Sequence, residues 1–293
     1  MDQQNQTLNY FSTHADDWQT KATQADYSVI DNRHAAVLTV IEQHNQVKRF
    51  LDVGCGTGQL VIAVAKLGIK ASGLDFSREM IVKCESNKLH AQVDAEFQCG
   101  SFFDISLPDD TFDVISAQGF IEYISLEQMD IFLSNCVKTL VPGGSLALGS
   151  RNRLFNLHSL NCFTELEMEL GTVKSLLSES IVLQGSASQE EAIRRLTQLE
   201  RTYPQPELHP ITGIKVDTRY QFSPADLMAR MRKHGLRPRA IYPVHFHGLP
   251  SAVIRDEDMA PLHKQLAQLV SGQKITDCRY VPYSSSFVLE AQR

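Results

Sequence analysis

The run FLDVGCGTG at residues 50–58 joins a short apolar strand to a glycine-rich turn. Phe50, Leu51 and Val53 suit a buried strand. The turn carries three glycines, which let the backbone approach a ligand that no side chain would admit: Gly54, Gly56 and Gly58. Asp52 argues against pyrophosphate as that ligand, because a carboxylate beside the turn repels negative phosphate. A cationic ligand is favoured instead.

A second carboxylate follows at the spacing of a mononucleotide-binding βαβ unit. Residues 60–67 give an apolar helical face, Gly68 ends that helix, and residues 69–74 form a second strand. Asp75 follows this strand, where such units supply a carboxylate for ribose. The alternative role for Asp75 is to cap the next helix, although Ser77 is the more natural cap. S-adenosylmethionine (SAM), with an ammonium and a sulfonium but no phosphate, fits this pattern.

These landmarks resemble the class I SAM-dependent methyltransferase family, whose first motif has the same acidic residue followed by Gly-x-Gly-x-Gly. Further matches are LPDDTFD at residues 107–113 and LVPGG at residues 140–144, in the family's order within residues 49–150. The resemblance implies SAM as cofactor and S-adenosylhomocysteine (SAH) as product. It implies that the first two strands contribute these cofactor-binding residues: Asp52, Gly54, Cys55, Gly56, Gly58, Asp75 and Phe76.

The resemblance also assigns the remaining wall of the cofactor site. Ser101 and Phe102 fall in the loop that meets adenine, with Ser101 in place of the more usual acidic residue. Gln118 and Gly119 would flank the methionine end of the cofactor. Tyr123 replaces a frequent histidine and is a candidate catalytic residue.

Four aromatic residues stand out in the N-terminal segment: Tyr10, Phe11, Trp18 and Tyr27. Their spacing resembles the N-terminal segment of the ubiquinone-pathway O-methyltransferases, which folds over the cofactor as a lid. On that reading Tyr10 and Trp18 contact the cofactor. The alternative is an aromatic stripe that packs the segment onto the core.

The predicted fold is α/β, a Rossmann-like sheet of seven strands with an antiparallel last strand and helices on both faces. Residues 1–48 form an N-terminal helical cap and residues 49–150 the SAM-binding core. Residues 151–222 form a helical insertion, with one helix presenting Leu166, Leu170, Val173 and Leu177 on one face and a second helix over residues 188–201. Residues 223–293 complete the core, beginning with a helix that Ser223 and Pro224 open, and carry an inserted helix at about residues 257–271.

Composition and charge indicate the kind of substrate and the cellular compartment to expect. The 293 residues carry a net charge of −6 and show no basic block, which disfavours a nucleic-acid substrate. The six cysteines have no CxxC spacing and indicate a reducing compartment. The first residues are polar and no apolar run reaches membrane-spanning length, so we expect a cytoplasmic protein. The sequence does not indicate an oligomeric state.

Candidate catalytic residues lie beyond the core motifs. His245 and His247 are two apart on the sixth predicted strand, hence on one face, and either could act as a general base. The alternative is a pair of polar strand-end residues without a catalytic role. They predict no metal site, because no third ligand stands at a recognisable spacing.

Guanidinium and aromatic groups near the same edge could bind the methyl acceptor. The candidates are Arg151, Arg153, Arg219 and Tyr220. Guanidinium groups bind carboxylate or phosphate in bidentate fashion, so an acidic small molecule or a nucleotide-linked sugar would suit them. Loop arginines are otherwise solvated surface residues.

Three hypotheses about function follow. The first is a SAM-dependent methyltransferase that transfers a methyl group to an oxygen or nitrogen of a small molecule, such as a metabolite or glycan precursor. The second is a SAM-binding module without catalysis. The third is an NAD-dependent oxidoreductase, which Asp52 and the lack of Gly-x-Gly-x-x-Gly spacing disfavour.

Overall fold

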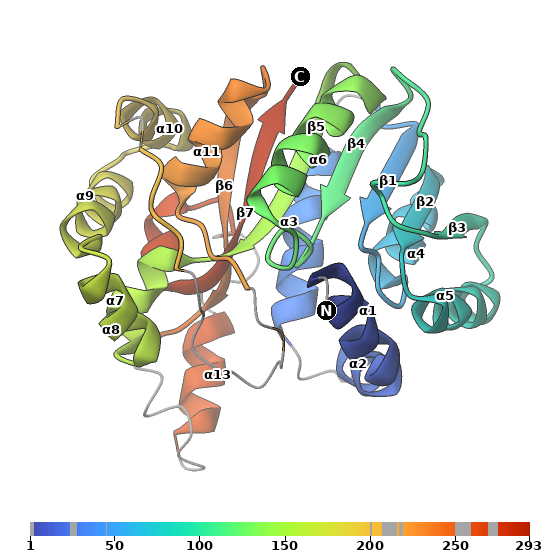
Figure 1. Ribbon diagram of the computed structural model, residues 1–293, viewed down its shortest axis with the longest axis horizontal. Coiled ribbons are helices and arrows are strands. Elements are labelled where there is room, and N and C mark those ends of the chain that lie inside the picture. The colour runs from blue at the N-terminus through green and yellow to red at the C-terminus, as the bar shows by residue number, and fades with distance from the viewer. Residues whose placement is uncertain are drawn as a thin grey trace.

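A seven-stranded sheet forms the centre of the computed structural model, which describes residues 3–23, 28–44, 46–199, 201–206, 216, 219–249, 259–268 and 275–293. The strand order is β3-β2-β1-β4-β5-β7-β6, and β7 runs antiparallel to both neighbours (Figure 1). The strands are β1 (Arg49–Val53), β2 (Lys70–Asp75), β3 (Ala95–Cys99), β4 (Phe112–Ala117), β5 (Leu140–Arg151), β6 (Arg237–Phe246) and β7 (Ser284–Gln292). The predicted sheet, including its antiparallel last strand, is confirmed.

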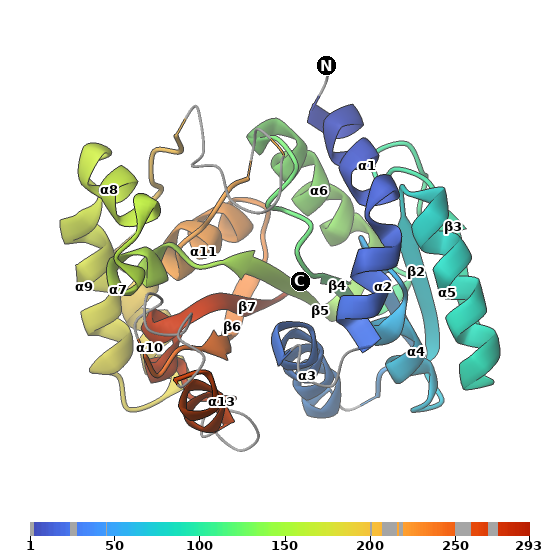
Figure 2. The same cartoon turned by 90° about the horizontal axis from the view of Figure 1, so that it is seen from below.

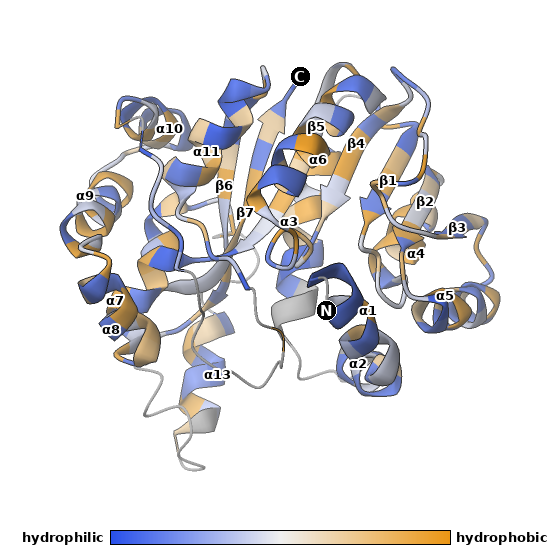
Figure 3. Ribbon diagram, in the orientation of Figure 1, coloured by the Kyte–Doolittle hydropathy of each residue, from blue (hydrophilic) through white to orange (hydrophobic). Residues whose placement is uncertain are grey.

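Helices cover both faces of this sheet (Figure 2). On one face lie α3 (Ser28–Gln43), α4 (Gln59–Ala65) and α5 (Arg78–Ala91), and on the other lie α6 (Leu126–Thr139) and α11 (Pro224–Lys233). Each set buries apolar side chains against the strands, as Val61 does on the first face and Phe132 on the second. Figure 3 shows the apolar residues gathered on the central strands, as expected for a sheet buried on both sides.

Helix ends follow the capping signals in the sequence. The Ser77 hydroxyl accepts from the Met80 amide at the start of α5, and Ser223 does the same for α11, with Pro224 at its first position. Gly68 and Gly235 follow α4 and α11 with φ values of 79° and 85°, a backbone conformation that glycine adopts without strain. The helix-capping serines and helix-ending glycines that were predicted from the sequence are therefore confirmed.

The N-terminal segment forms separate helices rather than one. They are α1 (Gln3–Thr13) and α2 (Ala15–Thr23), followed by α3. The first two contact α5, through a 3.2 Å hydrogen bond between Ser12 and Ser77 and an ion pair between Asp16 and Lys83. Tyr27 lies outside the described residues.

The insertion after β5 is a compact helical group, at the left of Figure 1. It contains η1 (Arg153–Phe155), α7 (Asn156–Ser159), α8 (Cys162–Glu169), α9 (Val173–Gln184) and α10 (Gln189–Thr197). The predicted single helix through Leu166 and Leu177 is wrong, because Gly171 adopts a φ of 67° and breaks it into α8 and α9. Leu177 is half exposed as a result of the new helix direction. The second predicted helix begins at its Ser188 cap but ends earlier than expected.

A buried ion pair fixes the start of this insertion. The Arg153 guanidinium donates to both carboxylate oxygens of Glu167, at 2.9 and 2.5 Å, and to the Pro204 carbonyl at 3.0 Å. Both charged side chains are 2% exposed, and Asn156 and Thr172 also donate to Glu167. Arg153 is therefore a structural residue, which corrects its predicted role in substrate binding.

We expect Glu167→Gln to lower the free energy of unfolding by about 2 kcal/mol, because it leaves a buried guanidinium without its counter-charge. Chemical denaturation measures this change. Glu169→Gln is the matched control, since Glu169 is an exposed carboxylate on the same helix. Equal stability of the two variants would contradict the structural role.

The last insertion contains α13 (Ala260–Gln268), and η3 (Cys278–Tyr283) leads into β7. The predicted helix at 257–271 is confirmed where it is described, while both of its predicted ends lie outside the described residues. Among the helices that the structure describes, none combines the length and apolar content needed to cross a bilayer.

Candidate functional site

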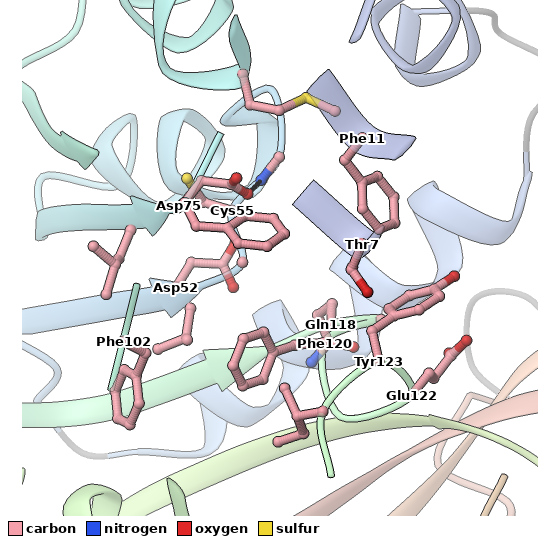
Figure 4. A pocket seen from close by; sticks show the side chains of 18 of the residues that line it. Thr7, Phe11, Asp52, Cys55, Asp75, Phe102, Gln118, Phe120, Glu122 and Tyr123 are labelled. Atoms are coloured by element: carbon pink, nitrogen blue, oxygen red, sulfur yellow. Dashed lines mark hydrogen bonds between the residues drawn. The ribbon is translucent and has the colours of Figure 1, made fainter. Parts of the chain in front are cut away.

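A pocket opens at the carboxyl ends of β1, β2 and β4, beneath the N-terminal helices (Figure 4). This edge is where open α/β sheets bind ligands. Most of the predicted site residues line it: Trp18, Asp52, Gly54, Cys55, Gly56, Asp75, Phe76, Ser101, Phe102, Gln118, Gly119, Tyr123 and Arg151. The motifs are thus brought together in space as the sequence predicts.

The three glycines of the turn all have positive φ, and the surroundings of Gly56 and Gly58 differ. A Cβ at Gly56 would meet nothing within 4 Å, so this glycine leaves room on the pocket wall. A Cβ at Gly58 would lie 2.9 Å from the Phe97 ring, and Gly58 does not line the pocket in the described part of the chain. Its role in the structure is close packing at the start of α4.

Asp75 holds the glycine turn through backbone contacts. One carboxylate oxygen accepts from the Gly56 amide and the other from the Ser77 amide, both at 2.9 Å. Ser77, and not Asp75, caps α5. Burial raises the pKa of Asp75 to about 6, against the opposing effect of these amides.

Asp52 presents a buried acceptor to the pocket. Its side chain is 4% exposed, and its Oδ1 has no hydrogen-bond partner among the described residues. Burial raises the pKa of Asp52 to about 7, with a smaller raising effect from Asp75 that a hydrogen bond with Ser116 opposes. The Oε1 atom of Gln118, at the end of the neighbouring strand β4, is likewise buried without a described partner. The Gln118 oxygen lies against Gly149 of β5, whereas the Asp52 carboxylate belongs to a residue that lines the pocket and suits a donor with a positive charge.

Helix α1 covers the pocket with Phe11 and Thr7, which face Asp75 and Cys55 in Figure 4. The Phe11 ring packs edge-on against Tyr123 at 5.2 Å and near Trp18 at 5.8 Å. Tyr10 instead stacks on His14 at 4.4 Å and is absent from the described pocket lining. Phe11, and not the predicted Tyr10, therefore lines the pocket from α1.

Sequence reasoning missed two charged residues of the pocket, Glu122 and Arg33. Glu122 is 1% exposed and accepts from Arg151 Nε at 2.8 Å, while Arg33 Nη2 lies 3.4 Å from its other oxygen. Arg33 also reaches over Gly119, where a Cβ would lie 2.9 Å from its Nη1. Arg33 comes from α3, and neither helical periodicity nor a motif distinguished it in the sequence.

Arg219 and Tyr220 contact Glu122 from behind the pocket wall. Arg219 Nε lies 3.8 Å from Glu122 Oε2, and the Tyr220 amide donates to the Glu122 carbonyl at 2.8 Å. Neither residue is part of the described pocket lining. Their predicted contact with the substrate stays a prediction.

The two predicted histidine bases lie together, and neither is among the residues of the described lining. His247 Nε2 is 3.2 Å from His245 Nδ1, which is 2.9 Å from the Ser285 hydroxyl. Burial lowers the pKa of His245 to about 3 and that of His247 to about 4. The histidine that lines the pocket is His34, whose pKa burial and Arg33 lower to about 4. Burial, aided by Glu122, raises the pKa of the Tyr123 hydroxyl, which therefore keeps its proton.

A glycine turn and two carboxylates at the edge of a sheet with this strand order define a class I methyltransferase fold. Residues 50–144 match the family described as a methyltransferase domain. The chain is 30% identical over 153 residues to a ubiquinone biosynthesis O-methyltransferase from Coxiella burnetii, and the match covers 52% of this chain and 64% of that protein. A second such protein, from Mesorhizobium japonicum, is 33% identical over 108 residues, which cover 36% of this chain and 41% of that one.

A solved structure supports the fold over the full chain. The magnesium protoporphyrin IX methyltransferase from Synechocystis, with bound SAH, superposes with a TM-score of 0.57 at 13% identity, over 100% of both chains. Residues 50–144 thus match a methyltransferase domain, and the chain shares the fold of class I SAM-dependent methyltransferases. The chain spans less than two thirds of the length of the curated relatives that it matches.

Proposed function

We propose that the protein binds SAM in this pocket and transfers its methyl group to an oxygen or nitrogen of a small molecule. The observation that carries the proposal is the buried Asp52 Oδ1, an acceptor without a described partner on the wall of the glycine turn. A carboxylate in such a place is costly unless a cation pairs with it. The ammonium of SAM is a cation of the required size.

The rest of the pocket fits the other parts of SAM. Arg33, whose Nε is buried without a described partner, suits the methionine carboxylate beside Gly119. Asp75 can accept from the ribose hydroxyls through its remaining lone pairs. Phe76 and Phe102 offer apolar surface for adenine.

When bound, SAM supplies a methyl group on a sulfonium, which an acceptor can displace in line. The chain's own contribution is then to align the acceptor and exclude water. Phe11, Trp18 and Tyr123 form the cover that excludes water. His34 lines the pocket with a neutral ring, because burial and Arg33 lower its pKa to about 4, and it can accept a hydrogen bond that orients a hydroxyl acceptor.

Transfer of labelled methyl separates the two SAM-binding hypotheses. The purified protein is incubated with [methyl-³H]SAM and a small-molecule extract of the native cells. We expect label to appear in a small molecule. SAM binding without transfer to any fraction would favour the non-catalytic module.

We expect SAH binding to weaken as the pH falls, because protonated Asp52 and Asp75 no longer attract an ammonium or accept from ribose. The pKa of Asp52 is raised to about 7 and that of Asp75 to about 6. Both carboxylates are therefore ionised above pH 8, where SAH binds most tightly, and the affinity falls as the pH drops through 7 and 6. The dissociation constant should be about 10- to 20-fold higher at pH 6 than at pH 8. Calorimetric titration at several pH values measures it, and an affinity that is flat over this range would contradict the role of both carboxylates.

We expect His34→Gln to lower the rate of label transfer by at least about tenfold with little change in SAH affinity. The same label-transfer assay with His245→Gln tests the catalytic role that was predicted for His245 from the sequence. Because the His245 ring lies outside the described lining, its replacement should have the smaller effect. Wild-type rates for His34→Gln would contradict the proposed role of His34 in orienting the acceptor.

A further inference from the structure

We infer, on the basis of the proposed SAM binding, that Asn87 is a positioning residue that holds helix α2, and with it Trp18, against the glycine turn of the cofactor site. Asn87 lies on α5 and is not among the residues of the described pocket lining. Its side chain contacts Gln19 of α2 and the carbonyl of Thr57 in the glycine turn. Asn87 therefore acts on the pocket through Trp18 and Thr57, which both line it.

The Asn87 amide is matched to both of its partners. Nδ2 donates to the Thr57 carbonyl at 2.8 Å and to Gln19 Oε1 at 3.0 Å, and Oδ1 accepts from Gln19 Nε2 at 3.0 Å. Because the Thr57 carbonyl can only accept, Nδ2 is the atom that must face it, which fixes the orientation of the amide. Both N–H groups of Asn87 are thus used, one on the turn and one on α2.

Helix α5 holds two successive carbonyls of the glycine turn. The Cys84 thiol donates to the Gly56 carbonyl at 3.1 Å, and Asn87 donates to the Thr57 carbonyl. Cys84 and Asn87 are three residues apart and so lie on one face of the helix. Since Gly56 and Thr57 line the pocket, this face of α5 fixes a part of the pocket wall.

The bond to Gln19 fixes the direction of Trp18. Helices α1 and α2 lie beside α5 in both views (Figures 1 and 2). Gln19 follows Trp18 on α2, and neighbouring side chains on a helix point about 100° apart. When Gln19 is bound to Asn87, the rotation of α2 is set, and Trp18 is directed to the pocket beside Phe11, at 5.8 Å between the rings.

The other contacts described between these helices and α5 are weaker anchors. The Asp16 carboxylate pairs with Lys83 at 2.5 Å, but the Asp16 side chain is 88% exposed, so solvent screens the pair. Ser12 and Ser77 share one hydrogen bond of 3.2 Å. The pair between Gln19 and Asn87 makes two hydrogen bonds without a net charge, so salt does not screen it.

Trp18 fluorescence tests this role directly, because Trp18 is the single tryptophan of the chain. Asn87→Leu keeps the approximate size of the side chain and removes all three hydrogen bonds, while Gln19→Ala removes the pair from the side of α2 and leaves α5 and the turn intact. We expect each variant to raise the acrylamide quenching constant of Trp18 in the free protein at least about twofold, since α2 detaches more often. The dissociation constant of SAH should rise at least about tenfold.

A double-mutant cycle separates positioning from a general loss of structure. Either single change already breaks the pair, so the quenching constant of the double variant should not exceed that of Asn87→Leu. Two matched controls on α5 are Ser86→Ala, at an exposed neighbour of Asn87, and Lys83→Gln, which removes the exposed ion pair with α2. Both controls should remain within about twofold of wild type in quenching and in SAH affinity.

The outcomes distinguish this role from the proposed function. Wild-type quenching and SAH affinity in both Gln19→Ala and Asn87→Leu would overturn the inference. Strictly additive effects in the double variant would also overturn it, because the two residues would then act independently. A wild-type protein that binds no SAH would contradict the proposed function instead, and Trp18 quenching in the ligand-free variants would still decide whether Asn87 holds α2.

Discussion

Asp75→Ala is expected to lower the affinity for SAH by at least about 100-fold, because each charged hydrogen bond lost to a ribose hydroxyl costs about 1.5–3 kcal/mol. The same change frees the Gly56 and Ser77 amides, so the glycine turn also loses its support. Asp75→Asn keeps the size of the side chain and separates the loss of charge from the loss of bulk. Isothermal titration calorimetry with SAH measures both variants.

Asp94→Ala is the matched control for this experiment. Asp94 is an exposed aspartate in the loop before β3 and lies outside the described pocket lining. Its replacement should leave the titration unchanged. Unaltered SAH binding in Asp75→Ala would contradict the assignment of the second carboxylate.

Asp52→Asn should weaken SAH strongly but leave 5′-methylthioadenosine almost unaffected. The two ligands share adenosine, and the second lacks the amino acid whose ammonium Asp52 is proposed to bind. Removing one charge of a buried pair costs about 3–5 kcal/mol, so the SAH affinity should fall by at least about 100-fold. Competition binding of SAH and methylthioadenosine to the wild-type protein and to Asp52→Asn measures the ratio of the two affinities in each protein.

Arg33→Gln provides a parallel test at the other end of the amino acid. It should also weaken SAH in preference to methylthioadenosine, because Arg33 is proposed to bind the methionine carboxylate. An equal loss for both ligands in Asp52→Asn would show that the change had disrupted the glycine turn generally. That result would contradict a specific contact with the ammonium.

The parts of the site that the sequence predicted are made by short local segments. Asp52, Gly56 and Asp75 lie at the ends of two neighbouring parallel strands, so their spacing along the chain fixes their proximity. Capping serines and helix-ending glycines set the elements between them in the same local way. This is why the core could be predicted without knowledge of tertiary contacts.

The missed residues depend on contacts between distant segments. Arg33 and Glu122 are 89 residues apart in sequence and meet only when α3 packs against β5, β6 and β7. Nothing in the local sequence of Arg33 distinguishes it from a surface charge. His34 was missed for the same reason, since a histidine in a helix gives no sign of which cavity that helix covers.

Arg151 and Arg153 show how a local rule fails at the end of an element. Both arginines were expected directly after the fifth strand, at the edge of the sheet where ligands bind. The chain leaves β5 at Arg151 and enters η1 at Arg153, which turns the second guanidinium inward to Glu167. The packing of the insertion determines where β5 ends. For this reason Arg151 lines the pocket, while Arg153 is buried against Glu167.

Direct titration of the wild-type protein with SAH and with NAD tests the central claim, that the Asp52 to Gly58 turn is a SAM site. We expect saturable binding of SAH to a single site per chain and no measurable heat with NAD, whose pyrophosphate Asp52 would repel. The absence of SAH binding, or binding of NAD with comparable affinity, would contradict it.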